Sequence, residues 1–211
     1  MAFQHLRAKQ FRDRTLAMSE QLERTVLETE DELGVVEGLL LKDPEEAKRF
    51  SLNFMGTFLL ELMEVISTRR LFLIGTTLDK PFYLGDSPVA MHNQRRSEFF
   101  GNIGFGVEGI EIYMPLSSTL TLAAVCPTLI ETARQRLTHG TMTGLLSEAQ
   151  RSQLTSLLAA VEIGTLDLVP PGHVDFLNGL QVHWAGRFVI CPKGDFELAR
   201  RIVQDQAVRP A

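Results

Sequence analysis

The character of the chain changes near Arg69, and this change limits the folds that it can adopt. Residues 3–30 contain neither proline nor glycine and are rich in helix-forming residues, which predicts a long helical stretch. After Arg69 come short runs of β-branched and aromatic residues separated by glycine and aspartate, a pattern that is typical of strands. The sequence therefore predicts an α+β fold, in which a helical N-terminal third precedes a mostly antiparallel sheet packed with several helices.

The length and composition fit one substantial domain. The chain has 211 residues, of which 45% are apolar and 22% are charged, and these values exclude wholesale disorder. We expect a single domain over residues 1–205, with a helical part at 1–70 and a mixed part at 71–205. Residues 206–211 are expected to form a frayed tail.

The helical part contains a strong helix start followed by an apolar run. Asp43 is a good N-cap, and Pro44 suits the first helical position. Residues 53–66 are apolar around most of the helix circumference, which predicts a helix buried in the core and too short to span a bilayer. Glu61 and Glu64 belong to a narrow polar stripe, for which we favour contact with solvent over half of a metal site.

The later part predicts strands and then helices. Residues 71–74 and 81–84 are expected to form a hairpin, and residues 109–114 and 120–125 a second antiparallel pair. Between these pairs, residues 92–106 are expected to form a mobile, exposed loop. The remaining expected elements are helices at 128–137, 147–161 with a capping box at Ser147, 172–185 and 195–205, and a strand at 187–190.

Charge and cysteine usage restrict the partners. The formal net charge of −5 gives no global basic field for nucleic acid or for an anionic membrane. Locally, residues 1–14 carry +3 and residues 20–46 carry −8, which fits either a solvated face or a surface that docks a partner or a second copy. Cys126 and Cys191 stand 65 positions apart without a redox or zinc pattern, and no secretory signal precedes the first helix, so a cytoplasmic location is expected.

Common catalytic templates are missing from the sequence. There is no phosphate-binding P-loop, no dinucleotide-binding glycine motif, no nucleophile elbow and no zinc-protease motif. The five histidines are scattered without ligand spacing, so no metal site is predicted and the cofactor is left open.

Two polar groupings remain as candidate sites. Asp86 and Ser87 precede a proline, so they either form a turn at a strand end or present a carboxylate and a hydroxyl at a sheet edge. Asn178 and Gln181 are three residues apart on an otherwise apolar helix that leads to Arg187. The two amides either clamp this helix to the turn at Asp86 or face a ligand.

The same residues carry a family resemblance. The run Pro-Phe-Tyr-Leu-Gly-Asp-Ser-Pro-Val at 81–89, the Pro-Leu-Ser turn within 112–117, and the segments 174–178 and 185–187 resemble domain-of-unknown-function family 4238, a bacterial family. The resemblance supports the fold and the candidate site, but it implies no activity, cofactor or substrate. Ser87 stands where the family usually has asparagine, and the family's usual N-terminal His-x-x-Pro segment is absent, so a short or truncated member is expected.

Two functional hypotheses follow. In the first, the protein is an enzyme whose site comprises Asp86, Ser87, Asn178, Gln181 and Arg187, with Asp86 as base or metal ligand and Arg187 binding an anion. Hydrolysis of a phosphorylated or nucleic-acid substrate is the reaction proposed for this site. In the alternative, the protein is a non-catalytic interaction or regulatory module that docks, or forms a homo-oligomer, through its N-terminal helices.

Overall fold

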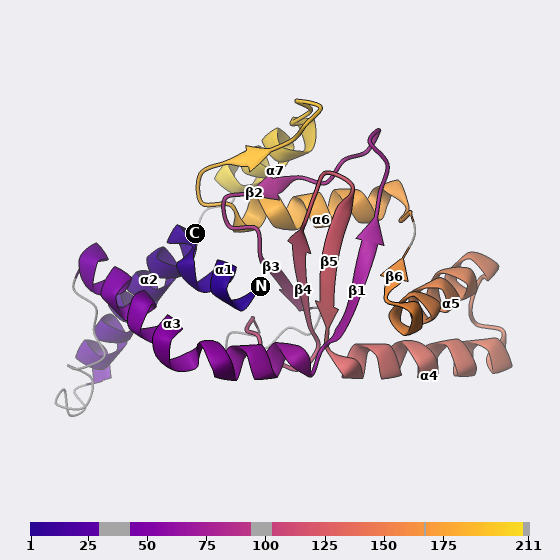
Figure 1. Ribbon diagram of the computed structural model, residues 1–211, viewed down its shortest axis with the longest axis horizontal. Coiled ribbons are helices and arrows are strands. Elements are labelled where there is room, and N and C mark those ends of the chain that lie inside the picture. Colours follow the sequence, from indigo (N-terminus) through magenta and orange to yellow (C-terminus); the bar gives the residue numbers. More distant parts are fainter. Residues whose placement is uncertain (30–42, 94–102, 167, 209–211) are drawn as a thin grey trace. The chain divides into compact units, whose positions relative to one another are not determined.

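The computed structural model describes residues 1–29, 43–93, 103–166 and 168–208 of the chain (Figure 1). Within these residues a helical N-terminal region precedes a sheet with further helices, so the α+β prediction is confirmed. The chain divides into two compact units, Met1–Leu62 and Met63–Ala211. The last helix extends to Val208, and residues 209–211 of the expected tail lie outside the described part.

The N-terminal helices begin where local chemistry favours them. α1 (Ala2–Arg7) and α2 (Lys9–Thr29) are separated at Ala8, whose backbone is extended with φ −63° and ψ 140°. α3 (Pro44–Ser67) begins after Asp43, whose Oδ1 accepts hydrogen bonds from the N–H groups of Glu45 and Glu46 at 2.8 Å each. The expected N-cap at Asp43 is therefore confirmed.

The prediction that residues 53–66 form a buried core helix is wrong. Of the α3 side chains, only Ala47 and Ser51 are buried, whereas Leu52 is 55% exposed and Leu60 is 77% exposed. The reason is that the contacts of α3 with the other N-terminal helices lie on one side of the helix. On that side the Ser51 hydroxyl donates to the Leu6 carbonyl at 2.8 Å.

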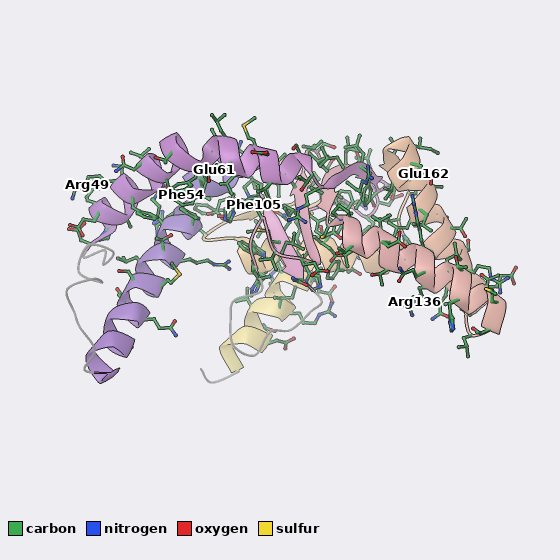
Figure 2. All side chains as sticks on the ribbon, turned by 90° about the horizontal axis from the view of Figure 1, so that it is seen from below. Arg49, Phe54, Glu61, Phe105, Arg136 and Glu162 are labelled. Atoms are coloured by element: carbon green, nitrogen blue, oxygen red, sulfur yellow. The ribbon has the colours of Figure 1, made fainter. Side chains whose placement is uncertain are left out.

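Aromatic contacts mark the packed side of α3. Phe54, labelled in Figure 2, belongs to α3. Its ring lies 6.1 Å from the ring of Phe11 on α2, measured between ring centroids. It also stacks on Phe58 at 4.5 Å, one helical turn further along α3. Apolar residues on the other sides of the helix therefore remain in contact with solvent.

The length of α3 also differs from the expectation. The helix has 24 residues and, among those that the structure describes, it is the one long and apolar enough to cross a membrane by length and composition. Only 6% of its most apolar window is buried, so this helix is not the core helix of its unit. The expectation that the apolar run is too short to span a bilayer therefore does not hold for the whole helix.

The second unit contains a five-stranded sheet with the order β3-β4-β5-β1-β6. β4 and β5 are antiparallel, with Tyr113 opposite Ala123, as the sequence predicts. β1 is antiparallel to β5 and parallel to β6, so the described sheet is mostly antiparallel. The strands are β1 (Arg70–Gly75), β3 (Ala90–Asn93), β4 (Ile110–Pro115), β5 (Leu120–Val125) and β6 (Thr165–Leu166).

The expected hairpin between residues 71–74 and 81–84 is wrong. β1 is already paired on both sides, with β5 and with β6, so neither of its edges is free for residues 81–84. Instead, β2 (Leu84–Gly85) forms a separate two-stranded ribbon with β7 (Val189–Ile190). The candidate turn at residues 85–88 therefore follows this ribbon and not the main sheet.

The helices of the second unit fall close to their predicted positions. The capping box is present, because the Gln150 N–H donates to the Ser147 hydroxyl and the Ser147 N–H donates to the Gln150 amide. α6 runs across the strands of the sheet (Figure 1), and its Val174 and Leu177 pack into the core beside the sheet. These helices are α4 (Pro127–Thr143), α5 (Glu148–Ile163), α6 (Pro171–Trp184) and α7 (Glu197–Val208).

The expected mobile loop at 92–106 falls largely on residues 94–102, which lie outside the described part of the chain. At its ends, His92 and Asn93 belong to β3, and Phe105 is buried with 7% exposure.

Candidate functional site

The carboxylate of Asp86 joins two segments that are a hundred residues apart in the sequence. Its Oδ1 accepts the Gly186 N–H at 2.8 Å, and its Oδ2 accepts the Arg187 N–H at 3.0 Å. The backbone N–H of Asp86 donates in turn to the Phe188 carbonyl at 3.0 Å. Asp86 is exposed and caps the chain where it leaves α6 for β7.

The amide of Asn178 binds the backbone that precedes this turn. Its Oδ1 accepts the Tyr83 N–H at 2.7 Å, and its Nδ2 donates to the Pro81 carbonyl at 3.0 Å. Asn178 is only 3% exposed. Its side chain therefore bonds both a donor and an acceptor of the segment, as a neighbouring strand would.

The amide of Gln181 repeats this pattern one turn further along α6. Its Oε1 accepts the Gly85 N–H at 3.0 Å, and its Nε2 donates to the Pro88 carbonyl at 3.0 Å. Trp184 continues the series, because its indole N–H donates to the Met91 carbonyl at 3.0 Å. We call these three residues, Asn178, Gln181 and Trp184, the α6 seam.

Glycine at position 85 allows the close approach that the α6 seam requires. A Cβ atom at Gly85 would lie 3.2 Å from the Gln181 carbonyl oxygen and 3.5 Å from the Ala185 Cβ. The first of these contacts is tighter than most real Cβ contacts, and its partner is helix backbone that cannot move freely. The seam therefore depends on Gly85 as well as on the two amides.

The structure brings the predicted site residues together in one place, but the polar side-chain atoms of Asp86, Asn178 and Gln181 are used for hydrogen bonds to the backbone. Arg187 meets Asp86 through its backbone N–H, and its exposed side chain lines a depression of about 540 Å³. Ser87 is buried, with 5% exposure. This geometry matches the clamp that was one of the two alternatives for Asn178 and Gln181. It gives no separate support to the hydrolase hypothesis, which stays a prediction.

A polar cavity of about 220 Å³ lies beside the seam. Lys80 and Asp175 on its wall form an ion pair at 2.5 Å, and Lys193 lies 3.5 Å from Asp79. The Tyr83 hydroxyl donates to the Asp195 carbonyl at 2.8 Å. Burial, together with the negative charges nearby, raises the pKa of Tyr83 to about 12, so the hydroxyl stays protonated at neutral pH.

The two cysteines are free and buried. Burial alone would raise the pKa of the Cys126 thiol, but hydrogen bonds involving Thr128 and Gly109 lower it overall. Within the described ranges, no three His, Cys, Asp or Glu side chains are grouped so that they could hold a metal ion.

Sequence reasoning missed one pair of titratable residues, His92 and Glu111. The register of β3 and β4 places them directly opposite each other. Burial raises the pKa of Glu111 to about 7 and lowers the pKa of His92. The signal that could have found Glu111 is strand alternation, because it shares a strand face with the core residue Tyr113.

Comparisons with known proteins give a family and no function. A family model described as "Protein of unknown function (DUF4238)" matches residues 1–195. No curated protein and no solved structure matches the chain.

Proposed function

The chain belongs to the DUF4238 family, and we propose that it works as an interaction module that pairs with a second copy of itself through α3. The observation that carries this proposal is the apolar surface that α3 leaves in solvent. Leu52 and Leu60 are 55% and 77% exposed, and both lie on the side of the helix away from Ser51 and Phe54. Side chains of this size gain free energy when a partner removes them from water.

A glycine lies between the two leucines on the same face. Gly56 is four residues from each of them, and a Cβ atom built at this position would meet nothing within 4 Å. Glycine inside a helix costs about 1 kcal/mol relative to alanine. A second helix that crosses at Gly56 would use the absent side chain for a close approach, with Leu52 and Leu60 on either side of the crossing.

Charge favours a second copy of the chain over a lipid surface as the partner of the exposed α3 face. The chain carries −5 overall, and α3 itself bears the exposed acids Glu61 and Glu64, which an anionic membrane would repel. Two copies, by contrast, offer each other opposite signs, because residues 1–14 carry +3 and residues 20–46 carry −8.

A cytoplasmic location belongs to the same proposal. It is supported by the two free cysteines, Cys126 and Cys191, which suit a reducing compartment.

The test is the mass of the particle in solution, measured by light scattering after size exclusion. We expect the wild type to show a dimer and Leu60→Glu to show a monomer, since a buried carboxylate without a partner would oppose pairing. Met142→Glu is the matched control, because Met142 on α4 is 83% exposed, and this variant should remain dimeric. A wild type that stays monomeric at every concentration, or a dimeric Leu60→Glu, would contradict the proposal.

A vesicle experiment separates pairing from membrane binding. Sedimentation of a monomeric wild type with zwitterionic lipid vesicles, abolished by Leu60→Glu, would show that a bilayer covers the α3 face and would replace the proposal.

A further inference from the structure

The polar cavity beside the seam lies wholly within the second unit of the chain. It has a volume of about 220 Å³ and is lined by residues of α6, of α7 and of the segments 79–83 and 191–195. Apart from Pro81, Cys191 and Leu198, these residues carry polar or charged side chains. Drug-sized ligands fill pockets of roughly 300–1,000 Å³, so this cavity fits a smaller and polar molecule.

Charges of both signs surround the cavity. Its lining includes four acids and three bases, which are Asp79, Asp175, Asp195 and Glu197, and Lys80, Lys193 and Arg201. A ligand with one sign of charge would be repelled by several of these groups, whereas a zwitterion can place each of its charges beside an opposite one. The lining therefore favours a molecule that carries both signs.

Two of the three bases already have partners. Lys80 and Asp175 form an ion pair at 2.5 Å, and the Lys193 Nζ donates to the Asp79 carbonyl at 3.0 Å. The Arg201 guanidinium, by contrast, has no ion pair or hydrogen bond among the described residues. Arg201 is therefore free to bind a carboxylate from solvent, which a guanidinium can hold through two parallel hydrogen bonds.

An acid without an ion pair lies one helical turn before Arg201. Glu197 and Arg201 are four residues apart on α7, which is about 6 Å along the helix axis and a spacing at which such side chains commonly pair. Both line the cavity, and within the described part of the chain no ion pair joins them. They therefore offer a short zwitterion one positive and one negative group side by side.

Hydrogen bonds hold the buried part of the wall in place. Tyr83 is 5% exposed, and its hydroxyl donates to the Asp195 carbonyl at 2.8 Å. Both polar atoms of the Asn178 amide bind the backbone of Pro81 and Tyr83. The wall is therefore arranged before a ligand arrives, and little free energy of binding is lost in ordering it.

We propose that this cavity binds a free α-amino acid with an uncharged polar side chain, whose carboxylate pairs with Arg201 and whose ammonium group pairs with Glu197. Each contact is a hydrogen bond between opposite charges, the stronger class of hydrogen bond. An uncharged polar side chain suits the polar wall and adds no third charge to a lining that already holds both signs. The site is built within the second unit and does not depend on pairing through α3.

Isothermal titration calorimetry with three matched probes tests the proposal. L-glutamine carries both charges, its α-amide lacks the carboxylate, and 5-amino-5-oxopentanoic acid lacks the ammonium group. We expect L-glutamine to bind the wild type, and each analogue to bind at least about tenfold more weakly because one charged contact is lost.

Two variants assign the charged contacts. Arg201→Gln and Glu197→Gln should each weaken L-glutamine binding about tenfold, and both should fold, since the replaced side chains are exposed. Arg201→Gln should remove the preference for L-glutamine over its α-amide. Glu197→Gln should remove the preference over the analogue without the ammonium group.

Two further variants serve as controls. Arg136→Gln changes an exposed base on α4 and should bind L-glutamine as the wild type does. Leu60→Glu should also bind normally, which separates this site from the pairing of two copies.

Three outcomes would overturn the proposal. They are the absence of L-glutamine binding by the wild type up to the limit of solubility, equal binding of the three probes, and unchanged L-glutamine binding by a folded Arg201→Gln.

Discussion

α3 and α6 are both rich in apolar residues, but the structure uses them in opposite ways. On α6, three polar side chains are buried and each hydrogen-bonds to the backbone of residues 81–91. On α3, the polar hydroxyl of Ser51 is buried, while Leu52 and Leu60 remain in solvent. Apolar content alone therefore does not decide which helix enters the core.

The two helices differ in the partners that their side chains find within their own units. The amides on α6 form hydrogen bonds with backbone groups of residues 81–88, which lie between β1 and β3. Because their polar atoms are paired, burying these amides costs little free energy. α3 contacts α1 and α2 along one side, and among the described residues its Leu52 and Leu60 remain exposed. α6 therefore completes the fold of its unit, whereas α3 leaves apolar side chains exposed to solvent.

The largest effect on stability is predicted for a substitution in the α6 seam. Asn178→Ala leaves the Tyr83 N–H and the Pro81 carbonyl without partners in a buried position, and it should lower the free energy of unfolding by about 2–4 kcal/mol. Urea denaturation measures this change. Gln135→Ala is the control, because Gln135 is exposed on α4, and it should change stability by less than about 0.5 kcal/mol. A loss for Asn178→Ala no larger than the control's would contradict the clamp.

The pH dependence of stability should have opposite signs in the two units. The pKa of Glu111 is raised to about 7 in the folded protein. Its contribution to the free energy of unfolding is therefore present at acid pH and is lost as pH rises from about 4.5 to 7. Burial and the charge of Arg14 lower the pKa of His5 to about 4, so its contribution is lost as pH falls from 6.5 to 4. Each effect should be on the order of 1–3 kcal/mol.

Thermal melts across these pH windows check both signs. Glu111→Gln should flatten the stability profile between pH 4.5 and 7, and His5→Gln should flatten it below pH 6.5. A Glu111→Gln profile that still falls as steeply toward neutral pH would show that another group is responsible.

A smaller effect is expected at the turn that links the seam to β7. Asp86→Ala removes two hydrogen bonds to exposed backbone, and it should cost about 0.5–1.5 kcal/mol, less than Asn178→Ala. Asp86→Asn keeps one acceptor and should recover part of this loss, which urea denaturation can measure. If Asp86→Ala instead left stability unchanged, its carboxylate would be available for another role, and the enzyme hypothesis would gain support.

The smallest effect on stability is expected on α3. Leu60→Gln replaces a side chain that is 77% exposed, so the free energy of unfolding of the isolated chain should change by less than about 0.5 kcal/mol. Dilute samples measured by urea denaturation test this expectation. A loss above 2 kcal/mol would mean that α3 contributes to the core of its own unit.

Local chemistry made much of the fold predictable. The N-cap at Asp43, the capping box at Ser147 and the β4–β5 pair all depend on residues close together in the sequence, and all three are confirmed. The sequence also predicts, as one of two alternatives, that the amides of α6 clamp this helix to the turn at Asp86, since buried amides need partners.

Long-range pairing could not be predicted in the same way. Residues 81–84 have strand-forming side chains, but their partner β7 lies a hundred residues later, and β1 was taken by β5 and β6. Whether α3 is buried depends on which other elements pack against it, and the periodicity of its apolar residues does not show this. The meeting of His92 and Glu111 required the register of β3 against β4.

The contrast between the two helices is tested most directly by a disulfide at Gly56. Gly56→Cys places a thiol at the centre of the exposed α3 face, while Cys126 and Cys191 are buried. If two copies cross at this position, mild oxidation should link Gly56→Cys chains into a covalent dimer at low protein concentration. Met142→Cys, at an 83% exposed position on α4, should form no covalent dimer under the same conditions. Equal and slow cross-linking of the two variants would contradict pairing through α3.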